Sequence, residues 1–76
     1  MAGGIWKLTT LGRKRAGSIY SDEARDSVVS YLYDLGKDKT ASVGELVGAT
    51  GKSESEVRAL LRKMGRQGLA EQVGGS

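Results

Sequence analysis

The feature that most constrains the fold is a pair of short helical patterns within residues 42–69, joined by a tight glycine turn. Each pattern begins with the sequence Ser-x-x-Glu, once at Ser42 and once at Ser53. In this capping box the serine oxygen accepts a hydrogen bond from the backbone amide three residues on, and the glutamate accepts one from the serine amide. Two such signals so close together predict two short, consecutive helices.

The apolar residues after each serine recur every three or four positions, which is the spacing of one face of an α-helix. They are Val43, Leu46 and Val47 in the first helix and Val57, Leu60, Leu61 and Met64 in the second. Gly51 and Gly68 lie where the two helices must end, because glycine readily adopts the left-handed conformation of a helix C-cap. Gly65 interrupts the second helix at a cost of about 1 kcal/mol relative to alanine. A short strand is predicted over residues 70–73.

The order helix, turn, helix, glycine and strand resembles the winged helix-turn-helix family, with MarR-like and ArsR-like domains as its nearest types. The positions that carry the resemblance are Leu46, Val47, Gly51, Ser53, Val57, Leu60, Leu61, Gly68 and Leu69. In this family the second helix of the pair reads the DNA major groove. The resemblance implies a small α+β domain over residues 1–76, with three main helices and a short antiparallel sheet. Its helical core would span 21–73 and its helix-turn-helix 42–66.

The composition of the chain limits the kinds of fold and functional site that it can form. A chain of 76 residues makes one domain with a small core. The absence of cysteine and histidine excludes disulfides, zinc sites built on those residues, and Ser-His or Cys-His nucleophiles. We therefore expect no enzyme activity, no cofactor and no metal. Because no apolar run is long enough for a membrane span or a signal sequence, we expect a cytoplasmic protein, in the nucleoid or nucleus when bound to DNA.

The net charge of +3 is unevenly distributed. Residues 1–17 carry four basic side chains and no acid, whereas residues 18–36 carry four acids against one arginine. Residues 52–76 are again basic. This alternation suits a protein with one basic face toward phosphate and an acidic back. Charged side chains spread over an ordinary protein surface would give a similar net charge, but they would not need to be segregated along the chain.

The segment before the helix pair predicts a strand and a short helix. Residues 5–9 alternate between apolar and polar, as in a half-buried strand, and Thr9 or Thr10 then caps a helix over residues 11–16. The string Leu-Thr-Thr-Leu-Gly-Arg at residues 8–13 resembles the strand-to-helix junction that follows the wing in MarR-like repressors. In this chain the junction comes first.

A winged helix needs two antiparallel strands after its second helix, yet only one strand candidate follows it here. A lone strand would leave its backbone amides and carbonyls without partners. We therefore expect residues 5–9 to pair antiparallel with residues 69–73, laying Trp6 and Leu8 over the second helix. The domain would then be a permuted winged helix whose first strand completes the wing, with the basic residues 13–15 near the sheet edge.

Residues 21–35 predict the longest helix of the chain. Ser21 caps it, two acids follow in its first turn, and Gly36 ends it. Its buried stripe is Ala24, Val28, Tyr31, Leu32 and Leu35. Tyr20, Tyr31 and Tyr33 are interpreted as half-buried core residues rather than as base-stacking groups. A polar loop over residues 37–41 follows and leads into a very short strand.

The candidate DNA-binding residues lie on the side of the second helix opposite its apolar face and in the basic N-terminal segment. The expected major-groove residues are Lys52, Ser53, Ser55, Arg58, Ala59 and Arg62, and the expected phosphate contacts are Lys63, Arg66, Arg13, Lys14 and Arg15. Arginine donates two hydrogen bonds to guanine, and serine or alanine fits beside a thymine methyl. A solvated helix face with an intrahelical Glu54–Arg58 ion pair is the alternative explanation.

The sequence thus predicts binding to double-stranded DNA, by a small transcriptional regulator or an accessory module. Two alternatives stay open: a winged helix that docks onto a protein in a transcription, replication or trafficking assembly, and one that binds RNA or the ribosome. The chain has little left over for a dimerisation helix. We therefore expect a monomer, with a homodimer as the other possibility.

Overall fold

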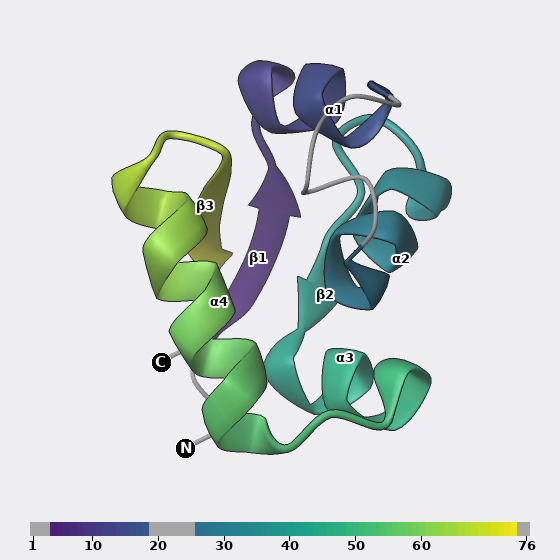
Figure 1. Cartoon of the computed structure of the whole chain (residues 1–76), viewed down its shortest axis with the longest axis vertical. Coiled ribbons are helices and arrows are strands. Elements are labelled where there is room, and N and C mark those ends of the chain that lie inside the picture. Colours follow the sequence, from purple (N-terminus) through teal and green to yellow (C-terminus); the bar gives the residue numbers. More distant parts are fainter. Residues whose placement is uncertain (1–3, 19–25, 75–76) are drawn as a thin grey trace.

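The computed structural model describes residues 4–18 and 26–74. Within these ranges the elements follow in the order β1 (Ile5–Leu8), α1 (Thr10–Ala16), α2 (Ser27–Leu35), β2 (Ala41–Ser42), α3 (Val43–Thr50), α4 (Glu54–Arg66) and β3 (Ala70–Gly74). The fold is α+β, with helices packed on a three-stranded antiparallel sheet, and it is consistent with the winged-helix class (Figure 1). The predicted α+β class with a short antiparallel sheet is confirmed.

The N-terminal strand β1 is the centre of the sheet, whose strand order is β2-β1-β3. It pairs antiparallel with both neighbours, so that Trp6 lies opposite Ala41 on β2 and Leu8 lies opposite Ala70 on β3. The predicted pairing of the first strand with the segment after the second helix is therefore confirmed. The short strand predicted at the end of the polar loop is also present, as β2.

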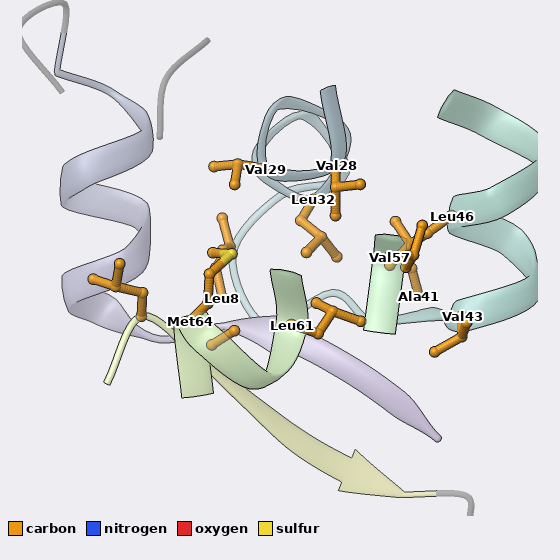
Figure 2. Packing of buried hydrophobic residues seen from close by; sticks show 12 residues of the cluster. Leu8, Val28, Val29, Leu32, Ala41, Val43, Leu46, Val57, Leu61 and Met64 are labelled. Atoms are coloured by element: carbon orange, nitrogen blue, oxygen red, sulfur yellow. The ribbon is translucent and has the colours of Figure 1, made fainter. Parts of the chain in front are cut away.

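The hydrophobic core lies between the sheet and helices α2, α3 and α4 (Figure 2). Its buried residues are Leu8, Val28, Val29, Leu32, Ala41, Val43, Leu46, Val57, Leu61, Met64, Leu69 and Ala70. The predicted apolar face of the second helix is confirmed, since Val57, Leu61 and Met64 are buried and Leu60 packs against them. Trp6 is half-buried at the margin of this core, and its ring lies beside Gly65 of α4. The first strand thus packs against α4 as expected.

The two predicted capping boxes are not equally complete. At the start of α4, the Ser53 hydroxyl accepts from the Glu56 amide (3.2 Å) while the Glu56 carboxylate accepts from the Ser53 amide (3.1 Å). At the start of α3, the Ser42 hydroxyl accepts from the Glu45 amide, but the Glu45 carboxylate accepts from the Tyr31 hydroxyl instead. Between the helices, Gly51 has the left-handed conformation (φ 75°) that the sequence predicts for the turn.

The predicted start of the helix before β2 is wrong. α2 begins at Ser27, because Asp26 is its N-cap and accepts hydrogen bonds from the amides of Val28 and Val29. The extended backbone of Asp26 (φ −81°, ψ 133°) ends the helix there, and aspartate is as good a cap as serine. Among the described elements α4 is therefore the longest helix, not α2. The expected cap Ser21 and the expected core residues Tyr20 and Ala24 lie outside the described residues.

A threonine joins β1, α1 and the turn that follows α4. The Thr9 amide donates to the Leu69 carbonyl (3.0 Å) and its hydroxyl donates to the Gly68 carbonyl (2.6 Å). The same hydroxyl accepts from the Gly12 amide, so Thr9 is the N-cap of α1, as one of the two predicted caps. A Cβ at position 12 would lie 1.8 Å from the Leu69 carbonyl oxygen. Only glycine lets α1 approach the turn this closely.

Gly12→Ala should therefore destabilise the fold, lowering the free energy of unfolding by about 1–3 kcal/mol, because the backbone must shift to admit the methyl group. Gly48→Ala in α3 is the matched control, since a Cβ there meets no atom within 4 Å. It should raise the free energy of unfolding by roughly 0.5–1 kcal/mol through helix propensity alone. Urea unfolding of both variants measures the difference, and a Gly12→Ala variant as stable as the parent would contradict the close contact.

Candidate nucleic-acid interface

The outer side of α4 is basic. Its core side is fixed by Val57, Leu61 and Met64, which are buried. Helical spacing turns a second set of residues away from the core, and all of them are exposed: Ser55, Ala59, Arg62, Lys63 and Arg66. None of the five is acidic. These five predicted site residues therefore share one solvent-facing side of a single helix.

The beginning of α4 has a different character, because its first turn contains Glu54 and Glu56. Ser53, predicted to face the major groove, is the N-cap and has both its hydroxyl and its amide engaged in the capping box. The Ser53 amide, followed by its hydroxyl, holds the pKa of the Glu56 carboxyl below its usual value, since hydrogen bonds to the charged form favour it. Lys52 is half-buried in the turn before the cap. These residues mainly build the start of the helix.

Arg58 is held by an acidic neighbour one turn earlier. Its Nη2 lies 2.6 Å from a carboxylate oxygen of Glu54, and the Arg58 side chain is 32% exposed. This is the intrahelical ion pair that the alternative explanation of the helix face predicts. The structure thus separates Arg58 from the exposed basic residues of α4. A contact between Arg58 and a base would have to compete with Glu54.

The N-terminal basic cluster lies on α1, at the end of the sheet where β1 ends and β3 begins (Figure 1). This is also the end at which α4 finishes, because the turn after α4 is bonded to Thr9. α4 begins at the opposite end, where β1 begins and β3 ends (Figure 1). The cluster is therefore close to the last turn of α4 rather than to its first turn.

The members of this cluster differ in their surroundings. The Arg13 guanidinium lies over the Tyr33 ring, 4.8 Å from its centroid, and Nη1 is 3.5 Å from the Tyr33 carbonyl oxygen. A cation–π contact of this kind is worth about 0.5–1 kcal/mol at an exposed site, so Arg13 helps to attach α1 to α2. Lys14 and Arg15 are exposed and line an open hollow on the outer side of α1. Tyr33, interpreted from the sequence as half-buried, is 37% exposed.

One polar contact between helices has no signal in the sequence. The Tyr31 hydroxyl donates to a carboxylate oxygen of Glu45 at 2.6 Å and so connects α2 to α3. This hydrogen bond is the main reason why the pKa of Tyr31 is raised above its usual value. Helical periodicity places Tyr31 near the core edge, but it does not indicate which residue of another helix it meets.

Comparison of the chain with protein-family models, with curated proteins and with solved structures gives no match. Over residues 4–18 and 26–74 there is no group of three or more acidic, histidine or cysteine side chains that could hold a metal ion. In the same part of the chain, no helix is both long enough and apolar enough to cross a membrane.

The capping box at the start of α4 makes stability depend on pH. Because the pKa of Glu56 is lower in the folded protein, its ionised form stabilises the fold above the unfolded pKa, and this contribution is lost as the pH falls through the folded pKa. Glu56→Gln keeps a hydrogen-bond acceptor but cannot titrate. Its melting temperature should fall less than that of the parent between about pH 7 and about pH 3.

Glu71→Gln is the control for this measurement, because Glu71 is an exposed carboxylate on β3 and has no part in the capping box. It should follow the pH dependence of the parent. Identical acid sensitivity in the parent and in Glu56→Gln would contradict the role given to the Glu56 carboxylate.

Proposed function

We propose that this protein binds double-stranded DNA through the exposed side of α4, as a small winged-helix regulator or an accessory DNA-binding module. The observation that best supports the proposal is the division of α4 into two sides. Val57, Leu61 and Met64 anchor the helix in the core, while the outer side of its last two turns carries exposed Arg62, Lys63 and Arg66 without an acid. A helix anchored in this way and basic outside is suited to a DNA groove and its flanking phosphates.

The arrangement of the strands supports the same proposal. α2, β2, α3, α4 and β3 follow one another in the order expected for a winged helix. β1 pairs with β3 as the second strand of a wing would, and it leads into the segment 8–13 that resembles the junction after the wing in MarR-like repressors. The fold therefore suits a permuted winged helix, in which β3 and β1 are paired but are not joined by a wing loop.

The alternative of a protein-docking winged helix receives less support. The large hydrophobic side chains that are exposed in the described part of the chain are Ile5, Leu11, Tyr33 and Val73. They come from four different elements, of which only β1 and β3 are paired in the sheet, and a few exposed hydrophobic residues of this kind are normal for a protein surface. The basic side of α4 is the more distinctive feature.

A binding titration with random-sequence duplex DNA tests the proposal. The logarithm of the association constant should fall linearly with the logarithm of salt concentration, by about 0.9 for each phosphate contacted. Arg62→Ala should weaken binding, by about 1–3 kcal/mol if the side chain contacts a base edge, or with a salt slope shallower by about 0.9 if it contacts a phosphate. Lys39→Ala is the control, because Lys39 is exposed on the loop before β2 and belongs to no part of the proposed interface.

Fluorescence anisotropy of a labelled duplex measures these affinities, and an RNA duplex serves as competitor. Affinity that does not depend on salt, or no binding at low salt, would contradict the proposal. Tighter binding to RNA than to DNA would favour the RNA-binding alternative instead.

A further inference from the structure

We infer that the duplex is held by its phosphate backbone at one end of the molecule, and that binding is therefore nearly independent of base sequence. We call this surface the basic end and define it by four exposed residues: Lys14 of α1 and Arg62, Lys63 and Arg66 of α4. The inference rests on the proposed function and specifies which part of the duplex is recognised and where. It differs from insertion of the beginning of α4 into the major groove.

The charge along α4 supports this location. In the turn before α4 and in its first helical turns, the positive charges of Lys52 and Arg58 are balanced by the negative charges of Glu54 and Glu56. Arg58 is moreover paired with Glu54 at 2.6 Å. The last two turns carry Arg62, Lys63 and Arg66 and no acid. A duplex that approached the beginning of α4 would bring its phosphates toward two exposed carboxylates, whereas the other half of the helix attracts them.

The fold adds α1 to the same end of the molecule. The hydrogen bonds of Thr9 to the carbonyls of Gly68 and Leu69 fix the first turn of α1 on the turn that follows α4. The close approach of Gly12 to Leu69 allows no gap between the two segments. α1 is thus held at the end of the molecule where α4 ends, although the two helices are far apart in the sequence (Figure 1).

The outer side of α1 gives Lys14 an open position. Lys14 lines a hollow together with Leu11, Arg15 and Ser18, and its side chain is exposed there. Arg13 is not part of the basic end, because its guanidinium lies over Tyr33. Exposed lysine and arginine side chains on two helices at the same end of the molecule can each contact phosphates, and phosphate contacts fix a protein on DNA without reading its sequence.

The consequence is a protein that binds any duplex with similar affinity. Contacts to phosphates release counterions and make binding depend steeply on salt, but they carry no direct information on the bases. The four residues of the basic end should therefore determine the salt dependence of binding. The residues at the beginning of α4 should have little effect on which duplex is preferred.

The experiment compares two double variants that remove the same charge from exposed side chains. Lys14→Gln/Arg66→Gln changes the basic end, and Lys37→Gln/Lys39→Gln changes the loop before β2. Anisotropy titrations use two duplexes of unrelated sequence over a series of salt concentrations. The first variant should lose affinity for both duplexes by the same factor, and its salt slope should become shallower by about 0.9 for each contact removed. The second should keep the slope of the parent.

Ser55→Gln tests the beginning of α4 separately. Ser55 is exposed in the first turn, and glutamine is a good helix former, so the variant should fold and bind both duplexes like the parent. Circular dichroism confirms that each variant is folded. The inference is overturned if Ser55→Gln changes the ranking of the two duplexes while Lys14→Gln/Arg66→Gln keeps the parent's slope.

That result would leave the proposed function intact and place recognition at the beginning of α4. Failure of the proposed function has a different signature, because the parent itself would then bind neither duplex in a salt-dependent way. In that case the inference would be overturned together with the proposal on which it rests.

Discussion

The antiparallel pairing of β1 between β2 and β3 is the interaction on which the rest of the structure depends. Among the described residues, β2 and β3 each pair with β1 and with no other strand of the sheet. β2 has only two residues, and β3 follows the last helix. Buried backbone amides and carbonyls must be paired, and the central strand supplies partners on both of its sides. It also brings Leu8 into the core and is followed directly by Thr9, which attaches α1 to the turn after α4. A segment at one end of the chain thus completes a domain that is otherwise built from residues 26–74.

The parts of this fold that the sequence predicts are those with local physical signals. The helix pair is marked by two serine caps, a left-handed glycine and apolar spacing, and each of these acts over a few residues. The pairing of β1 with β3 is predicted because the sequence contains only one strand candidate after the second helix, and that strand needs a partner. The start of α2 was predicted wrongly because Asp26 provides a second good cap, and local signals do not decide between two caps. The contacts Arg13–Tyr33 and Tyr31–Glu45 join different helices, and no periodicity in the sequence identifies such partners.

The candidate interface also combines features that local sequence signals predict with features that only the tertiary structure shows. Helical spacing alone separates the buried side of α4 from its basic side, and the structure places the residues accordingly. Their position relative to α1 depends on tertiary structure, which brings α1 to the end of the molecule where α4 ends and away from Glu54 and Glu56 at its beginning. The pairing of Arg58 with Glu54 follows from their spacing, yet it also distinguishes one arginine from the others on the same helix. The basic side chains of α1 and α4 are far apart in the sequence, and this packing brings their two helices to the same end of the molecule.

Hydrogen exchange at the β1 amides tests the central claim most directly. Successive amides of a strand point to opposite neighbours, and the bond from the Thr9 amide to the Leu69 carbonyl directs the Lys7 amide toward β3 and the Trp6 amide toward β2. Both should exchange only through global unfolding, with the same free energy of opening as the Leu61 amide in α4. Fast exchange at Trp6 or Lys7 while Leu61 stays protected would show that the first strand is not an integral part of the fold.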